Sequence, residues 1–181
     1  MAKFKGVGIV FMRKLIRSHP PEVEKQFLAK LSDDEKRLYE STLSASWVTL
    51  DLITKYCEIA SPLLFPNEGR GLWEIGRLMA LDNLKGIYKV IVRVLSPQTI
   101  LTQGAKLWAS YHEKGRASLR PSEDPRRASY IVEDYPEITA PFLELLRGYV
   151  YGALEACGAK DIEVNGKYDN PNHWEWHASW R

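Results

Sequence analysis

The last nine residues of the chain alternate strictly between apolar and polar side chains. The apolar set is Trp174, Trp176, Ala178 and Trp180, and the polar set is His173, Glu175, His177 and Ser179. A period of two residues is typical of a β-strand with one buried and one solvated face. Because three large rings share one face, helices must cover that face, and the chain must build a sheet that is covered on one side only.

Three further segments show the same period and are bounded by turn-forming residues. They span residues 115–120, 128–134 and 161–168. Between the last two of them lies a regular helical pattern, which Pro136 introduces and Gly158 ends in the usual C-terminal position. This part of the chain therefore predicts two pairs of antiparallel strands separated by one helix.

Up to residue 112 the apolar side chains recur at helical spacing instead. Helices are predicted over residues 6–18, 22–31, 47–60, 68–81, 84–95 and 97–111, with a short additional one that begins at the capping box Ser32-Asp33-Asp34-Glu35. Residues 71–95 are apolar over most of their surface, which is typical of buried helices. We expect this stretch to form the core, and its glycines, Gly71, Gly76 and Gly86, to allow close packing.

The sequence thus predicts an α+β fold, with about six N-terminal helices followed by β-β-α-β-β. The helices pack on one face of a four-stranded antiparallel sheet. In the helix over residues 97–111, the side chains expected to point inward are Ile100, Leu101, Leu107, Trp108 and Tyr111. A length of 181 residues suits a single domain, residues 1–181, with a helical part (1–112) and a sheet part (113–181).

Composition and charge disfavour several classes of protein. The net charge of +2 is too small to favour nucleic acid or an anionic membrane. Cys57 and Cys157 form no disulfide framework and no CxxC motif, as is usual in a reducing compartment. The apolar run over residues 6–12 is too short for a signal peptide or a membrane span. We therefore expect a soluble cytoplasmic protein.

Several short motifs appear in a recognisable order along nearly the whole chain. They are Lys5-Gly6, Ser46-Trp47, Gly76-Arg77, Leu84-Lys85-Gly86-Ile87-Tyr88, Leu95-Ser96-Pro97, the pair Gly148 and Gly152, and a final strand that ends in Trp180. In this order the chain resembles a group of prokaryotic proteins found especially in myxobacteria. That group is related to the vinyl-reductase-like (4VR) domain and the haem nitric-oxide-binding domain, and more distantly to subunits of Golgi transport particles. The resemblance implies a small-molecule-binding or sensory fold that is often dimeric and has no defined reaction.

The same resemblance implies where a haem ligand would lie. The haem-binding relatives use a histidine on the helix before the first hairpin and a Tyr-x-Ser-x-Arg motif on the strand after it. Here the helix over residues 97–111 has no histidine, and although Ser118 and Arg120 match the motif, Arg116 stands at the tyrosine position. Haem iron needs an axial ligand, so this comparison predicts that the chain carries no haem. The closing hairpin also lacks the cysteines that the vinyl-reductase-like relatives often carry.

His173, Glu175 and His177 are the nearest approach to a metal-binding constellation. They share one face of a strand, but at roughly 3.3 Å per residue the two histidines lie roughly 13 Å apart at Cα. Zinc needs ligand nitrogens about 2.0–2.1 Å from the ion, so the two histidines cannot easily share one. A neighbouring pair such as Glu175 and His177, with a residue of the adjacent strand, could. A solvated outer face is the simpler interpretation, and we expect no zinc.

Aromatic side chains could line an apolar pocket between the sheet and the central helices. Its candidate residues are Tyr88, Tyr111, Tyr149, Trp174 and Trp176. Small-molecule sites are mostly apolar with a few polar groups, which this set would provide, although an ordinary packed core gives the same pattern. Arginines crowd the first predicted hairpin, where Arg116 and Arg120 could bind an anion, with an exposed, charge-balanced turn as the alternative.

The sequence contains no nucleotide loop, catalytic triad or paired carboxylates. We therefore expect a non-catalytic small-molecule-binding or sensory module that takes an apolar ligand and forms a homodimer. A dimeric scaffold for a partner protein is an alternative with the same fold. A reductase-like enzyme is a second alternative, which rests on fold analogy alone.

Overall fold

The computed structural model describes residues 2–85 and 95–181. Its helices are α1 (Val7–Arg17), α2 (Pro21–Leu28), α3 (Asp33–Ser41), α4 (Leu50–Leu64), α5 (Gly71–Asn83), α7 (Pro97–Tyr111) and α8 (Ala140–Ala156). Its strands are β1 (Lys3–Lys5), β2 (Trp47–Thr49), β3 (Arg116–Pro121), β4 (Arg127–Glu133), β5 (Glu163–Asn170) and β6 (His173–Ser179). The helix predicted over residues 84–95 falls almost wholly outside the described residues. Within them, no helix is long and apolar enough to cross a membrane.

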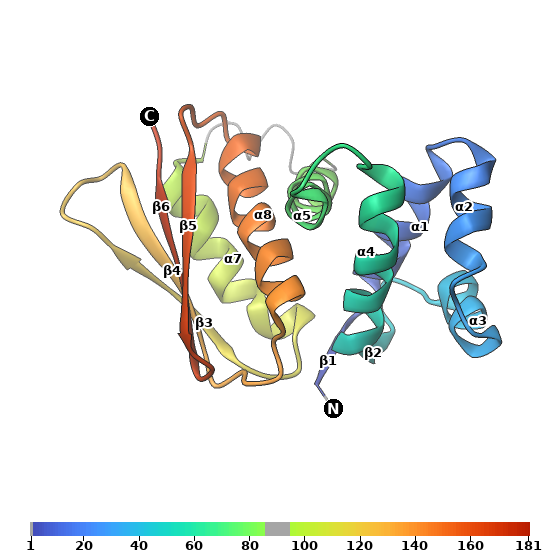
Figure 1. Ribbon diagram of the computed structural model, residues 1–181. Coiled ribbons are helices and arrows are strands. Elements are labelled where there is room, and N and C mark those ends of the chain that lie inside the picture. The colour runs from blue at the N-terminus through green and yellow to red at the C-terminus, as the bar shows by residue number, and fades with distance from the viewer. Residues whose placement is uncertain (1, 86–94) are drawn as a thin grey trace.

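The four C-terminal strands form an antiparallel sheet in the order β3-β4-β6-β5. Helices α7 and α8 lie against one face of this sheet, and the remaining helices continue away from it (Figure 1). The predicted α+β architecture is therefore confirmed. A second sheet, made of β1 and β2 only, was not predicted.

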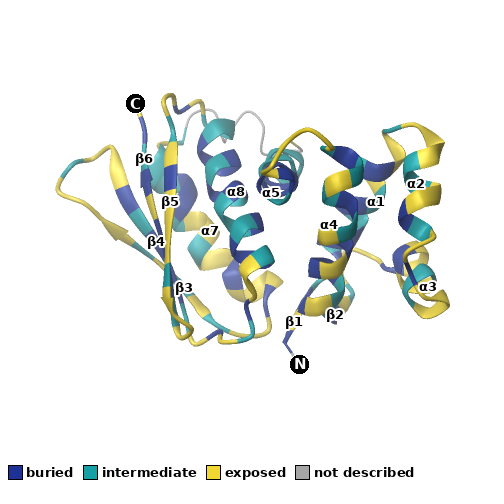
Figure 2. Cartoon of the chain, viewed as in Figure 1, coloured by how far each residue is buried: buried dark blue, intermediate teal, exposed yellow. Residues whose placement is uncertain are grey.

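The strand register explains the alternation in the sequence. Trp174 pairs with Val132 and Trp176 pairs with Tyr130, and all four side chains are buried on the face that α8 covers. The opposite face carries the polar set of β6, although Glu175 and its neighbour Ile131 of β4 are buried there too. Figure 2 shows buried, intermediate and exposed residues along these strands. The aromatic stripe of β6 is thus the sheet's contribution to the core.

Helices α5 and α8 approach each other more closely than side chains would allow. A Cβ atom built on Gly76 would lie 2.0 Å from the carbonyl oxygen of Leu145, and one built on Gly148 would lie 2.0 Å from that of Trp73. Only glycine fits at such crossing points. An ion pair between Arg77 Nη1 and Glu155 (2.7 Å) joins the same two helices. The expectation of close packing is confirmed at Gly76, and Gly86 lies outside the described residues.

The N-terminal region differs from prediction in two places. Trp47 begins a strand rather than a helix, because Trp47 pairs with Lys5 in a β1–β2 ladder. Helix α4 then continues through Pro62, where a loop was predicted. Only two residues of α4 follow this proline, so the helix loses one hydrogen bond near its end rather than in its middle. The predicted capping box is confirmed: Ser32 accepts from the Glu35 amide, and Glu35 accepts from the Ser32 amide.

Helix α7 buries a narrower face than its sequence suggested. Ile100, Leu101 and Trp108 are buried as predicted, but Leu107 and Tyr111 remain 50% and 41% exposed. A helix turns by about 100° per residue, so Leu107 cannot face the same way as Trp108. Tyr111 is the last residue of the helix. The prediction that these two side chains point inward was therefore wrong.

The α5–α8 crossing can be tested with a matched pair of glycine substitutions. We expect Gly148→Ala to lower the free energy of unfolding by about 2–3 kcal/mol, because its methyl group would force the two helices apart. Gly104→Ala, on an exposed part of α7 with no heavy atom within 4 Å of the new Cβ, should instead raise it by about 0.5–1 kcal/mol through helix propensity. Urea denaturation followed by circular dichroism measures both. Equal stability of the two variants would contradict the crossing.

Candidate ligand-binding site

A buried histidine marks the point where the N-terminal strand meets the end of α7. His112 directly follows α7, and its backbone N–H donates to the carbonyl oxygen of Trp108 (2.9 Å). It has extended backbone angles and forms an isolated antiparallel bridge with Phe4 of β1. Next to it, the Glu113 amide donates to the carbonyl oxygen of Lys3 (3.0 Å). These contacts fix the imidazole between β1 and α7.

Four aromatic rings from different elements surround this imidazole. The Trp108 indole stacks on it with ring centroids 3.6 Å apart, and the Phe4 ring lies at 4.8 Å. Tyr135, which follows β4, and Phe142 of α8 approach it edge-on at 5.8 and 6.1 Å. The His112 cluster, which we define as these five residues, therefore joins β1, α7, α8 and the end of β4.

Two polar atoms in the His112 cluster are buried without a hydrogen-bond partner. They are Nδ1 of His112 and the hydroxyl of Tyr135. Burial lowers the pKa of His112 to about 3, so the ring is neutral at physiological pH. A neutral imidazole nitrogen that carries no proton can accept a hydrogen bond or bind a metal ion. A buried polar atom without a hydrogen-bond partner lowers the stability of the fold, so we expect this position to have a functional role.

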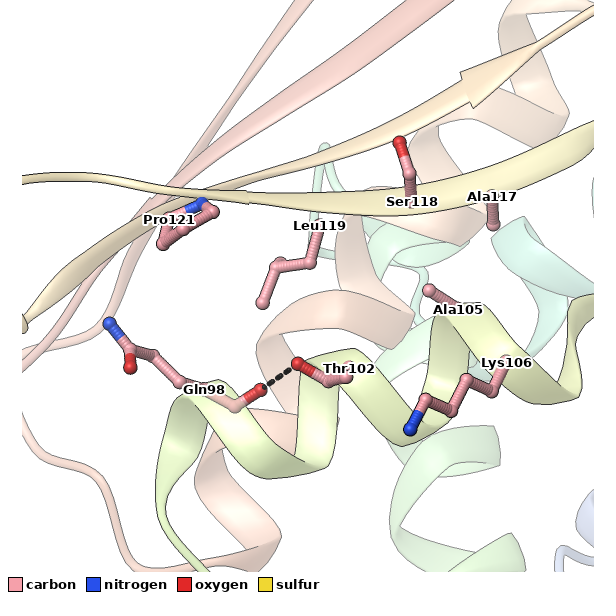
Figure 3. A pocket seen from close by; sticks show the side chains of 8 residues that line it. All are labelled: Gln98, Thr102, Ala105, Lys106, Ala117, Ser118, Leu119 and Pro121. Carbon is pink, nitrogen blue, oxygen red and sulfur yellow. Dashed lines mark hydrogen bonds between the residues drawn. The ribbon is translucent and has the colours of Figure 1, made fainter.

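A shallow pocket lies beside α7, between that helix and the edge strand β3 (Figure 3). Its volume is about 390 Å³. Ala117 and Leu119 of β3 point toward the helix, where the Thr102 hydroxyl donates to the carbonyl oxygen of Gln98 (2.8 Å) and is therefore satisfied. The Lys106 side chain borders the pocket at its other end. This pocket is a groove on the surface and is not an enclosed cavity.

A second depression of about 420 Å³ lies where α5, α8 and β5 meet. Arg70, Trp73, Arg147 and Tyr151 line it, with the Arg70 guanidinium 4.7 Å from the Trp73 ring centroid. Both arginines have acidic partners nearby in the sequence: Arg70, just before α5, lies 3.5 Å from a carboxylate oxygen of Glu74, and Arg147 lies 2.7 Å from one of Glu144. Their charge is therefore already balanced.

The predicted pocket residues are spread between the core and the surface. Trp176 is fully buried, and the indole N–H of Trp174 donates to the backbone oxygen of Tyr135 (3.0 Å), which connects the tryptophan strand to the His112 cluster. The Tyr149 hydroxyl accepts from the Asn83 side chain (3.2 Å). Tyr111 is exposed and cannot line an interior pocket, as noted above. Tyr88 lies outside the described residues.

The predicted ionic candidates all lie on or near the open face of the sheet. Arg116 pairs with Asp134 (2.6 Å) and Arg120 pairs with Glu175 (3.2 Å), so each guanidinium already has a carboxylate partner. His173, Glu175 and His177 share the outer face of β6 as predicted. Among residues 2–85 and 95–181, no group of three or more His, Cys, Asp or Glu side chains is arranged to hold a metal ion.

No protein-family model matches this sequence, and no curated protein matches it. Solved structures do match it. An H-NOX protein from S. oneidensis, in its Fe(II)NO state, aligns over 98% of this chain and 99% of its own, with 10% identity and a TM-score of 0.70. An unliganded Fe(II) H-NOX protein from K. algicida aligns over 98% and 96%, with 9% identity and a TM-score of 0.65. The chain shares the H-NOX fold.

A further similar structure comes from a study of haem redox potential and porphyrin distortion, with 10% identity, a TM-score of 0.66 and coverage of 97% of this chain and 99% of that one. The expected relation to haem nitric-oxide-binding domains is thus confirmed at the level of fold. The more specific resemblance to myxobacterial proteins and to Golgi transport-particle subunits stays a prediction.

The expectation of no cofactor, with haem disfavoured, is corrected by this finding, because the H-NOX neighbours are haem proteins. That expectation rested on the absence of a histidine from residues 97–111. All four histidines of the sequence lie in the described residues, and His112, one position beyond that range, is the only one of the four that is buried. Its unpartnered, neutral imidazole nitrogen has the chemistry of an axial haem ligand. The ring is packed against Trp108, so a macrocycle reaches Nδ1 only if this packing opens.

The burial of His112 predicts how stability depends on pH. Its pKa is about 3 in the folded chain and about 6.5 when unfolded. Because the folded value is the lower one, the contribution of the buried neutral ring to the free energy of unfolding is fully present above about pH 6.5 and is lost as the pH falls toward 3. Within that window we expect the free energy of unfolding to fall by up to about 1.4 kcal/mol for each pH unit. His112→Phe should flatten the slope in urea denaturation between pH 6.5 and 4, and an unchanged slope would show that His112 is not buried as a neutral ring.

Proposed function

We propose that this chain is a sensory module that binds a small molecule at the His112 cluster, and that haem is this ligand. The observation that carries the proposal is the unpartnered imidazole nitrogen of His112 in a chain that shares the H-NOX fold over nearly its full length. H-NOX proteins are known in Fe(II) and Fe(II)NO states, so the fold accommodates an iron that changes its ligands.

The surroundings of His112 suit an apolar, planar ligand. Phe4, Trp108 and Phe142 contribute rings and no charge, and Tyr135 adds one unpartnered hydroxyl. Ligand sites are mostly apolar with a few polar groups that fix orientation. His112 would bind through Nδ1, while the bound haem would supply an iron centre able to take up a diatomic gas.

The position of the cluster gives a binding event a route to the rest of the molecule. Phe4 belongs to β1, which pairs with β2, and β2 leads directly into α4. Any displacement of the imidazole or of Trp108 therefore acts on the strand that ties the N-terminal helices to α7. We infer that ligand binding shifts β1, which is the kind of two-state element that a sensor needs.

Titration of the purified chain with haem, followed by absorbance in the reduced state, tests the proposal. We expect saturation at one haem per chain, with a shifted Soret band that changes again when nitric oxide is added. His112→Gly should weaken haem binding at least tenfold, and added imidazole should restore the spectrum by replacing the missing side chain. His19→Ala, which removes a histidine of the N-terminal helical region, should behave like the original chain.

Two results would contradict the proposal. A chain that shows no stoichiometric change in its haem spectrum does not use haem as its ligand. An unchanged spectrum and affinity in a correctly folded His112→Gly variant would show that the iron is held elsewhere.

A further inference from the structure

The outer face of the four-stranded sheet carries a carboxylate that is buried despite its position. Glu175 lies on the polar face of β6, yet its side chain is only 7% exposed. His173 and His177 flank it on the same strand, at 32% and 53% exposure. Solvent-facing glutamates are rarely so enclosed. Neighbouring side chains therefore gather around this carboxylate.

The two oxygens of Glu175 have different surroundings. Oε1 accepts a hydrogen bond from Arg120 Nη1 (3.2 Å) and lies 3.6 Å from Nδ1 of His177. That imidazole nitrogen is already engaged, because it lies 3.0 Å from the hydroxyl of Ser129. Oε2 lies 3.6 Å from one imidazole nitrogen, Nε2 of His173. The oxygen that remains available for a ligand is therefore Oε2.

The distance between Oε2 of Glu175 and Nε2 of His173 is informative. At 3.6 Å it is too long for a direct hydrogen bond. Two ligands that each lie about 2.0–2.2 Å from a tetrahedral ion are about 3.4 Å apart. The pair is thus spaced more like two ligands of one ion than like a donor and its acceptor.

The second nitrogen of His173 faces another carboxylate. Its Nδ1 lies 3.4 Å from Oε1 of Glu133, the residue directly opposite on β4. Histidines that bind metals usually donate their other ring N–H to a carboxylate or carbonyl oxygen, which fixes the tautomer and the ring orientation. With the proton on Nδ1, Nε2 keeps its lone pair, and this nitrogen lies beside Oε2 of Glu175.

We propose that His173 Nε2 and Glu175 Oε2 bind a divalent transition-metal ion such as Zn²⁺, with water completing the coordination and Glu133 orienting the imidazole. The structure thus favours a different pair from Glu175 and His177, the neighbouring pair considered from the sequence. Imidazole nitrogen and carboxylate oxygen are both ordinary zinc ligands. With only two protein ligands, the site binds more weakly than a structural zinc site that has four.

The charges that face this site are mixed. Glu133 and Glu175 supply two negative charges, while Arg120 neutralises part of Glu175. Lys167 lies opposite Glu175 on β5, and its ammonium group is 3.9 Å from Asp169. A divalent cation would therefore neutralise negative charge of Glu133 and Glu175 that Arg120 and Lys167 offset from one side only.

Calorimetric titration of the untagged chain with ZnCl₂ at pH 7.5 tests the proposal. We expect one ion per chain, at least tenfold weaker binding in His173→Gln, and about tenfold weaker binding in Glu133→Gln. His177→Gln serves as the matched control on the same strand, and it should stay within about twofold of the original affinity. Circular dichroism establishes that each variant is folded.

A second measurement separates the metal site from a merely structural role. Imidazole resonances in ¹⁵N NMR should show Nε2 of His173 shifting on addition of Zn²⁺, with the resonances of His112 unchanged. The proposal is overturned if the chain binds no Zn²⁺, or if His177→Gln abolishes binding while His173→Gln does not.

Discussion

At Gly76 and Gly148, helices α5 and α8 approach so closely that the backbone oxygen of one lies where a side chain of the other would begin. Such contact leaves no room for relative sliding, because packed backbones cannot adjust as flexible side chains do. Helix α5 comes from the helical part of the chain and α8 carries the sheet. The sheet, its aromatic inner face and the N-terminal helices are therefore oriented by this crossing.

The His112 cluster is a second junction between the same two parts, and it is built differently. Here Phe4 of β1 meets the rings of His112 and Phe142, beside the single backbone bridge between Phe4 and His112. Rings can rearrange at lower cost than a glycine crossing, and Nδ1 of His112 has no partner to lose. A rigid joint beside an adjustable one would suit the proposed sensory function, since binding would have to move one region relative to a fixed frame.

Much of the fold could be predicted from local pattern, and the site could not. The alternation around Trp176 and the capping box at Ser32 are encoded within a few residues, so they identified the covered sheet and α3. The predicted helix ended before Pro62, because a proline usually breaks a helix. Here α4 runs only two residues beyond the proline, so little of the helix is affected. His112 was missed because nothing beside it in sequence shows that Phe4, over a hundred positions earlier, encloses it. Burial of this kind is a property of tertiary packing alone.

Native-state hydrogen exchange, measured residue by residue with NMR, tests most directly whether α5 and α8 form one structural unit. If they do, the slowest amides around Gly76 and Gly148 will exchange with the same free energy, equal to that of global unfolding. If the α5 amides exchange through a much less costly opening while those of α8 stay protected, the crossing does not hold the two parts together.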